Sequence, residues 1–213
     1  MTRVVWNDPT ERIIHGGLDR GMLYRALEPG LPWNGLISVD ESSSGGETQG
    51  YYIDGIKHLN NVAPEEYTAT LSAFSRPKEF APCEGLNGDN NGLYFAQQPR
   101  QSFGLSYRSG VGNGVAALGS DHQIHLVYNA KTTPTTKNRK TLTNVSTPMT
   151  LSWGLTVLPV TIAGVRSTAH LVLETSEMEP SVLQEVEDAL YGTPSSDPYL
   201  PTPLEMISFF AGG

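Results

Sequence analysis

Residues 149–157, MTLSWGLTV, alternate strictly between large apolar side chains and small or polar ones. The apolar positions are Met149, Leu151, Trp153, Leu155 and Val157. Because successive side chains of a strand point to opposite faces, this stretch predicts a strand with one apolar face. Its other face carries Thr and Ser, which are suited to contact with water.

Other stretches repeat the same period of two. They lie at 66–74, 101–108, 124–128 and 167–174, with shorter candidates at 36–39 and 51–57. Alternation of this kind is typical of antiparallel sheets that bury one face and turn the other to water or to another subunit. The predicted fold class is mainly β, an antiparallel β-sandwich or barrel with a long loop arm and C-terminal helices.

Glycine-containing turns agree with a chain of short strands. Asn-Gly pairs stand at 34–35, 87–88, 91–92 and 113–114. Such pairs accept the positive φ angles of tight turns. The stretch 41–50, ESSSGGETQG, is polar and glycine-rich, so we expect no packed element there. Residues 39–57 are interpreted as a long loop or an extended hairpin arm, and loops of that length are usually functional or disordered.

Two helices are predicted at the end of the chain. Pro180–Tyr191 has apolar residues at helical spacing and is followed by Gly192 as a stop signal. A capping box at Thr202–Glu205 starts a second helix, which should run to about Phe210. Its apolar side chains must dock on the same domain or on a neighbour. The expected organisation is a β domain over 1–175, with the arm around 40–57, and a helical extension over 176–213.

Charge is distributed unevenly along the 213 residues, whose net charge is −8. Residues 167–213 contain eight acidic residues and no Lys or Arg, so the rest of the chain is neutral. High-affinity binding of nucleic acid needs clustered cations, which this composition does not favour. The densest cationic group lies in the Thr-rich loop 131–143 and comprises Lys131, Lys137, Arg139 and Lys140. This loop is either a solvated hairpin tip or a contact for an acidic surface of a neighbouring copy.

The sequence contains no recognisable catalytic, cofactor or metal motif. His122 and His125 are three apart on a predicted strand, so they should point to opposite faces and not chelate one ion. A stretch that resembles the start of a calcium loop, from Asn87 to Gly92, ends in Gln98 where a bidentate Glu is needed. Cys83 has acidic neighbours, which raise a thiol pKa. We therefore expect no enzyme activity and no cofactor.

Nothing in the sequence predicts a membrane span or an export signal. No apolar run approaches the ~20 residues that a membrane helix needs. The first residues, MTRVVWNDPTER, lack the apolar core of a signal peptide. The single cysteine excludes a disulfide framework within the chain.

Several short motifs, in a fixed order over most of the chain, resemble one family. They are Trp33–Leu36 leading to Glu41-Ser42, Tyr52-x-Asp54-Gly55-x-Lys57-x-Leu59, Glu65–Tyr67, Glu79-Phe80 with Cys83–Gly85, Gln97-Gln98 leading to Phe103–Arg108, His125–Tyr128 with the Lys- and Thr-rich turns that follow it, Ser152-Trp153, Glu187–Gly192 and Leu200–Pro203. The family is the major tail protein, or tail tube protein, of phages with long non-contractile tails, in the form common among actinobacteriophages.

This resemblance implies a virion structural protein that forms hexameric rings stacked head to tail into the tail tube. The implied partners are further copies of the chain, the tape-measure protein, and the tail terminator and distal tail proteins. DNA would pass through the lumen during ejection without specific binding, and no membrane would be involved. The implied location is the virion tail, after assembly in the host cytoplasm. The family has no catalytic motif, so no active-site residue carries over.

Contacts between subunits are the expected functional sites. The residues predicted to lie at them are Glu41, Ser42, Ser43, Ser44, Gly45, Gly46 and Glu47 of the arm, Lys131, Lys137, Arg139 and Lys140 of the basic loop, and Glu185, Glu187 and Asp188 of the acidic segment. The basic loop should meet the acidic segment of a neighbour, so charge reversal at Lys137 and Arg139 should slow assembly. Deleting residues 41–49 should leave folded monomers that form no tubes.

Two other classes remain open at the level of sequence. Capsid decoration proteins and tail terminators are also β-rich, but they cap or cover a surface and do not polymerise. A carbohydrate-binding β-sandwich would need exposed aromatic side chains over a groove. The aromatic candidates for such a groove are Trp6, Trp33, Tyr51, Tyr52 and Tyr199.

Overall fold

The computed structural model describes most of the chain. The described residues are 6, 8–9, 12–88, 91–113, 115, 117–139, 141, 148–162, 164 and 166–212. Its strands are β1 (Ile14–Arg25), β2 (Leu31–Pro32), β3 (Leu36–Gly45), β4 (Thr48–Ile53), β5 (Ile56–Val62), β6 (Glu65–Ala73), β7 (Asn87–Gly88), β8 (Tyr94–Phe95), β9 (Phe103–Gly112), β10 (Asp121–Thr133), β11 (Leu151–Val157) and β12 (His170–Glu174). The helices are α1 (Pro180–Tyr191) and α2 (Pro203–Ala211), with 3-10 turns η1 (Lys78–Glu84) and η2 (Thr175–Glu177).

One large antiparallel sheet forms the body, in the order β2-β1-β9-β10-β11-β6-β3. Strand β10 is long enough to have two neighbours along one edge. Its residues Gln123–Val127 pair with β12, and its residues Ala130–Thr133 pair with β11. Within the described residues the sheet does not close into a barrel, since β1 and β3 approach each other without forming a ladder. The mainly β, antiparallel fold class with C-terminal helices is confirmed.

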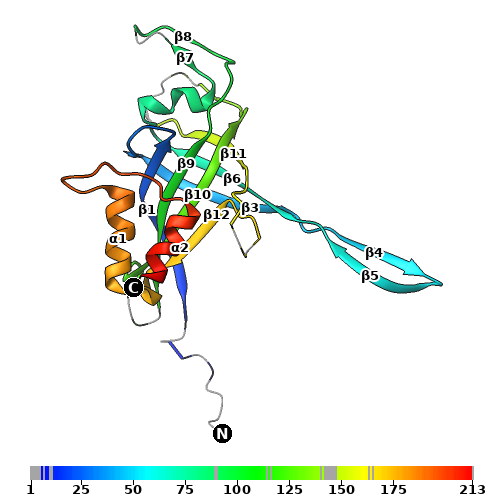
Figure 1. Ribbon diagram of the computed structural model, residues 1–213. Coiled ribbons are helices and arrows are strands. Elements are labelled where there is room, and N and C mark those ends of the chain that lie inside the picture. The colour runs from blue at the N-terminus through cyan, green and yellow to red at the C-terminus, as the bar shows by residue number, and fades with distance from the viewer. Residues whose placement is uncertain are drawn as a thin grey trace.

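Both faces of the central strands are buried, contrary to the expectation of one wet face. Along β10, Ile124, Leu126 and Tyr128 pack under α1 and α2 (Figure 1). Val127 and Ala130 point the other way, into a core built around Trp153 and its neighbours from β6, β9, β11 and η1. The helical extension therefore covers the apolar face of β10, and on β9 it covers the face of Ser106 and Arg108 that the sequence pattern assigned to water or to another subunit.

An aromatic cluster lies at the centre of the second core. Trp33, Phe80, Phe103 and Trp153 meet edge to face, with ring centroids 4.6–5.7 Å apart. Such edge-on contacts add to the stability gained by burial. Trp153 is in the core, as its place on an apolar strand face predicts. Trp33 is also buried, so it is not available for a carbohydrate-binding groove.

The predicted arm is a long hairpin and not a loop. Strands β3 and β6 pair from Leu36↔Ala73 out to Gly45↔Glu65, and β4 and β5 continue the hairpin as a separate two-stranded sheet. Residues Glu41–Gly45, where no packed element was expected, are an exposed part of β3, so the extended hairpin is the alternative that the structure supports. Figure 1 shows the outer hairpin projecting far from the body.

Glycines allow the hairpin to change direction between its two sheets. Gly45 and Gly46 have φ angles of 88° and 70°, in the left-handed region that favours glycine. A Cβ atom on Gly45 would lie 2.4 Å from the carbonyl oxygen of Pro64. At the far tip, Asp54 and Gly55 also have positive φ and close a tight turn.

Helix α2 docks on its own domain. The capping box between Thr202 and Glu205 is present, as predicted. The helix packs through Met206 and Phe209, and the Tyr128 hydroxyl donates a hydrogen bond of 2.8 Å to the preceding Pro201 carbonyl. Its other apolar side chains point outward. These exposed residues, between 47% and 71% accessible, are Leu204, Ile207 and Phe210.

Candidate functional site

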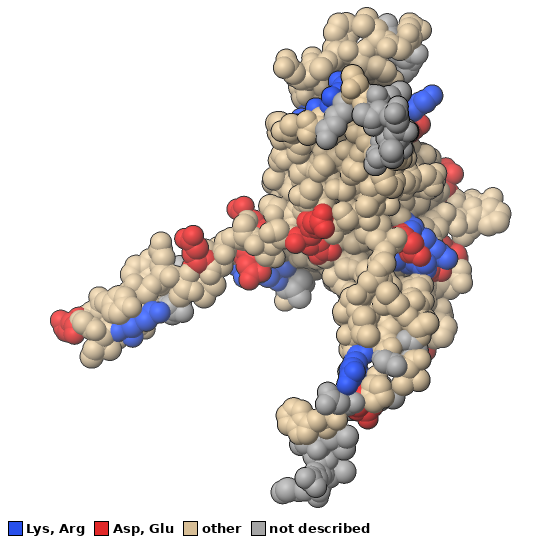
Figure 2. Space-filling view, turned by 180° about the vertical axis from the view of Figure 1, so that it is seen from behind, with Lys and Arg blue, Asp and Glu red and all other residues tan. Residues whose placement is uncertain are grey.

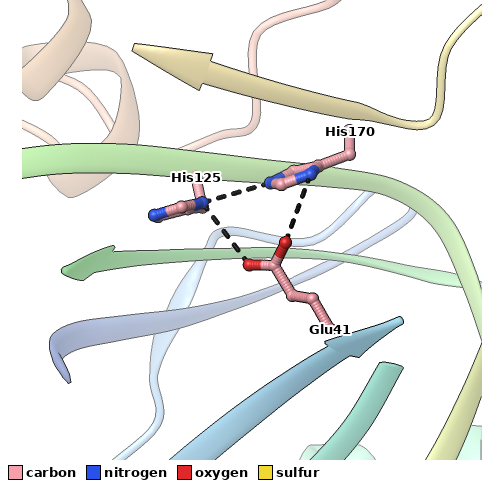
Figure 3. Close-up of side chains that lie close together, drawn as sticks. All are labelled: Glu41, His125 and His170. Carbon is pink, nitrogen blue, oxygen red and sulfur yellow. Dashed lines mark hydrogen bonds and ion pairs between the residues drawn. The ribbon is translucent and has the colours of Figure 1, made fainter. Parts of the chain in front are cut away.

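Three strands bring together two histidines and a carboxylate at the base of the arm (Figure 3). Glu41 comes from β3, His125 from β10 and His170 from β12. His125 Nδ1 lies 3.2 Å from His170 Nε2 and 3.6 Å from Glu41 Oε1, and His170 Nδ1 lies 3.6 Å from Glu41 Oε2. One potential ligand atom from each residue lies within 4.8 Å of the others. We call these three residues the arm-base cluster.

Neighbouring side chains hold the arm-base cluster in place. The Tyr107 hydroxyl donates a short hydrogen bond to Glu41 Oε1. The Tyr107 ring stacks on the His125 ring with centroids 4.6 Å apart and an interplanar angle of 5°. Ser109 Oγ lies 2.9 Å from His125 Nε2, and the Tyr67 ring lies beside His170. Ser109 therefore holds Nε2 of His125, while Nδ1 of the same ring faces His170 and Glu41.

Burial sets the protonation state of the arm-base cluster. Removal from water lowers the pKa of His125 to about 4, although the Glu41 carboxylate opposes this shift. The pKa of His170 is also lowered by burial. Burial, together with the nearby Tyr67 and Glu41, raises the pKa of Tyr107. Burial therefore favours the neutral form of both imidazoles, and the contact between His125 Nδ1 and His170 Nε2 fits a hydrogen bond in which one ring donates to the other.

A cavity of about 380 Å³ opens onto the arm-base cluster at the seam between β1 and β3. Its lining includes Glu41, Ser109, Tyr107 and His125. Because β1 and β3 do not pair there, small solutes can approach the cluster from the seam. Buried histidines with an access path can bind a metal ion or take part in proton transfer.

From the sequence, Glu41 is expected in a long loop or an extended hairpin arm and at a contact between subunits, and no role is expected for His125 or His170. His122 and His125 form the pair whose ability to chelate one ion is considered above. His122 contacts the carbonyl oxygen of Asp121 and is not in the cluster. The expected opposite orientation of His122 and His125 thus agrees with the contacts. The sequence feature that could have pointed to His170 is the alternation in β12, because it sets this histidine apart from the apolar residues beside it.

The predicted basic loop has one member bound within its own chain. Lys137 Nζ lies 2.8 Å from Glu84 Oε2, a carboxylate buried at the end of η1. Lys131 lies in β10 and is exposed, as is Arg139. Lys140 lies outside the described residues. The contact of this loop with a neighbouring copy stays a prediction.

The acidic segment lies on α1, where one of its members faces arginines of the sheet. Glu187 Oε1 lies 3.1 Å from Arg20 Nη1 and 3.6 Å from Arg108 Nη1. Arg108 also forms a bidentate pair with Asp19, at 2.7 and 2.8 Å, and this bond lowers the pKa of Asp19. Asp188 accepts a hydrogen bond from Gln184, while Glu185 is exposed.

Other expectations concern Cys83 and membrane spans. Burial raises the pKa of Cys83 to about 11, so the direction expected from the sequence is correct and the largest cause is desolvation. Among the described residues, none of the helices has the length and apolar character needed to span a membrane. Charged side chains on the face seen in Figure 2 occur in small groups amid a largely uncharged surface.

Comparison with known proteins gives little further guidance. Neither a protein-family model nor a curated protein sequence matches the chain. Among solved structures, the cryo-EM structure of the anti-feeding prophage cap, described as a tube-terminating cap, is similar over 82% of this chain and 95% of that chain. The TM-score is 0.35 and the identity 15%. A likeness at this level is no basis for a function, so the function is argued from the chain's own residues.

Proposed function

We propose that this chain is a structural subunit of a phage tail that assembles with copies of itself through its arm. The observation that carries the proposal is the outer hairpin, β4–β5, which projects from the body (Figure 1). An isolated two-stranded hairpin is marginally stable in water, and its unpaired edges are available to other strands. Such an element gains its stability when a partner covers it.

The outer hairpin has an apolar face of its own. The strand register places Tyr51 opposite Leu59 and Ile53 opposite Ile56, on the same face. Each of these four side chains is between 52% and 64% exposed. A contiguous apolar patch on an extended arm is typical of a surface that binds another protein.

Head-to-tail assembly needs two different surfaces on each subunit. The exposed apolar side chains of α2, Leu204, Ile207 and Phe210, provide a second surface on the body. An arm that docks on a different surface of the next copy generates a ring where the rotation closes and an open series of subunits where it does not. This supports polymerisation over a closed dimer.

Within this proposal, the sequence motifs favour the tail tube. Copies of the chain would form hexameric rings that stack around the tape-measure protein and later conduct DNA, with terminator and distal tail proteins at the ends. A net charge of −8 suits a conduit, since negative walls repel phosphate and prevent sticking. Electron microscopy of the purified chain at rising concentration tests the proposal. Long tubes are expected, whereas single rings would indicate a terminator, and persistent monomers would contradict self-assembly.

The basic loop gives a more specific prediction about assembly. Arg139→Glu should slow tube growth severalfold at low salt, because an exposed cation at an interface accelerates encounter with an acidic partner. The difference from the unmodified chain should shrink at high salt. Light scattering during assembly measures both rates. Lys78→Glu, an exposed charge reversal outside the predicted interface, is the control, and an equal effect of the two variants would remove the role of the loop.

We also propose that the chain is not an enzyme, although Ser109 and His125 are in hydrogen-bond contact. A serine nucleophile requires nearby donors aimed at the developing oxyanion. Ser109 lies inside the sheet, opposite both Leu18 of β1 and Gln123 of β10, so its backbone is engaged in the ladders. Activated ester substrates should be hydrolysed no faster than by a Ser109→Ala variant. A rate that depends on Ser109 would contradict this.

A further inference from the structure

We propose that Glu41, His125 and His170 bind one divalent transition-metal ion of the zinc class, which fastens the base of the arm to the sheet. This inference does not rest on the proposed function. It rests on the convergence of three ligand-bearing side chains from three separate strands.

The spacing of the potential ligand atoms suits a small ion. In a tetrahedral zinc site, with metal–ligand bonds of about 2.0–2.1 Å, neighbouring ligand atoms lie roughly 3.3–3.5 Å apart. In the arm-base cluster, one candidate ligand atom from each residue lies within 4.8 Å of the others. The contacts of 3.2 Å and 3.6 Å involve different nitrogens of His170, Nε2 toward His125 and Nδ1 toward Glu41. To bind one ion, the three ligand atoms would therefore have to move closer together by up to roughly 1.5 Å through side-chain rotation.

The donor set favours a transition metal over calcium or magnesium. Two imidazoles and one carboxylate are typical zinc ligands, whereas calcium and magnesium prefer oxygen atoms alone.

The surrounding contacts have the form expected of an outer shell around a metal site. Ser109 Oγ holds the His125 nitrogen that faces away from the cluster, which leaves Nδ1 directed inward. Tyr107 holds one oxygen of the Glu41 carboxylate. Such partners fix ring orientation and ligand basicity in metalloproteins. The cavity at the β1–β3 seam leaves space for a water molecule at the fourth position.

A bound ion would connect parts of the sheet that are not adjacent in it. Glu41 lies on β3 at one edge, and His125 and His170 lie on the paired strands β10 and β12. The cross-link would fix the direction in which the arm leaves the body. The free energy of zinc binding would then add to the free energy of unfolding. Tm should rise by roughly 5–10 °C at a zinc concentration about a hundredfold above Kd.

The test uses the full, tag-free chain after removal of metals with a chelator. Titration calorimetry with Zn²⁺ should give one site per chain with a Kd of micromolar or below, and Co²⁺ should give the visible absorption of a four-coordinate site. His170→Asn and Glu41→Gln should each weaken zinc binding about a hundredfold and abolish the zinc-dependent rise in Tm.

His122→Asn is the matched control, because His122 is on the same strand as His125 but outside the cluster. It should bind zinc like the unmodified chain. The metal-free Tm and circular dichroism of each variant show whether it folds, and the Co²⁺ spectrum reports the ligand set separately from stability. No zinc bound by the unmodified chain, or binding that His170→Asn leaves intact, would overturn the proposal.

Discussion

A chain that lacks Thr48–Val62 should fold normally, remain a monomer, and form no tubes. This deletion removes β4 and β5 and joins Glu47 to Ala63, whose backbone groups are already hydrogen-bonded at 3.0 Å. The new connection is a short loop between the ends of β3 and β6. Because none of the described side chains of the outer hairpin belongs to either core, the Tm of the shortened chain should differ little from that of the full chain.

The loss of assembly should follow from the apolar face of the hairpin. Replacing Ile53 and Ile56 with Ser removes apolar area from that face and should reduce assembly at least tenfold. The matched control is Tyr52→Ser with Lys57→Ser, which changes the opposite face of the same hairpin. Sedimentation and electron microscopy measure the assembled fraction. Tubes of ordinary length from the shortened chain would exclude a role for the arm in assembly.

Deletion of Thr48–Val62 is a sharper experiment than removal of residues 41–49. Glu41–Gly45 pair with β6 over the inner half of the hairpin, and Glu41 accepts the hydrogen bond of Tyr107. Removing them would disturb the sheet edge and the arm-base cluster together. A failure to assemble would then have two causes that could not be separated.

Elements with a strong local signal were predictable from the sequence. β11 lies within the alternating stretch 149–157, and α1 begins at Pro180 and ends before Gly192, as its apolar spacing and stop signal indicate. In both cases the pattern depends only on the geometry of one element, so neighbours in space are not needed to recognise it.

Strand β1 was missed for an identifiable physical reason. Its register shifts between Gly16 and Leu18 and again between Asp19 and Met22. Bulges of this kind insert extra residues and break the period of two. Gly17 and Arg20 also have positive φ angles, and such backbone angles cannot be recognised from an alternation of apolar and polar residues.

The arm-base cluster could not be found from the sequence because it depends on how the sheet curves. Glu41, His125 and His170 come together only when β3 approaches the region where β10 and β12 pair.

The same limit applies to the buried polar face of β9. Ser106 and Arg108 alternate with apolar residues as an exposed strand would, but α1 covers them, and Tyr24 and Asp19 satisfy their polar groups.

Glu84→Ala should lower the free energy of unfolding by about 3 kcal/mol, because it leaves the buried indole N–H of Trp153 and the partly buried guanidinium of Arg76 without their acceptor. The Glu84 side chain is 3% exposed and joins three groups. Its oxygens lie 2.6 Å from Arg76 Nε, 2.8 Å from Lys137 Nζ and 3.1 Å from Trp153 Nε1. Urea unfolding measures the loss, and Tm should fall by roughly 10 °C. Glu79→Ala, an exposed change in the same 3-10 turn, should have little effect.

The variant Lys137→Ala distinguishes two roles of the basic loop, which are support of the core of its own chain and contact with a neighbouring subunit. Lys137 is 43% exposed, so losing its ion pair with Glu84 should cost only about 1 kcal/mol or less, while Arg76 and Trp153 still hold the carboxylate. If Lys137→Ala instead destabilised the chain as much as Glu84→Ala, the loop would be a structural support of the core. Because Lys137 has a partner within its own chain, the charges that remain to meet a neighbouring subunit, among the members of the loop that the structure describes, are those of Lys131 and Arg139.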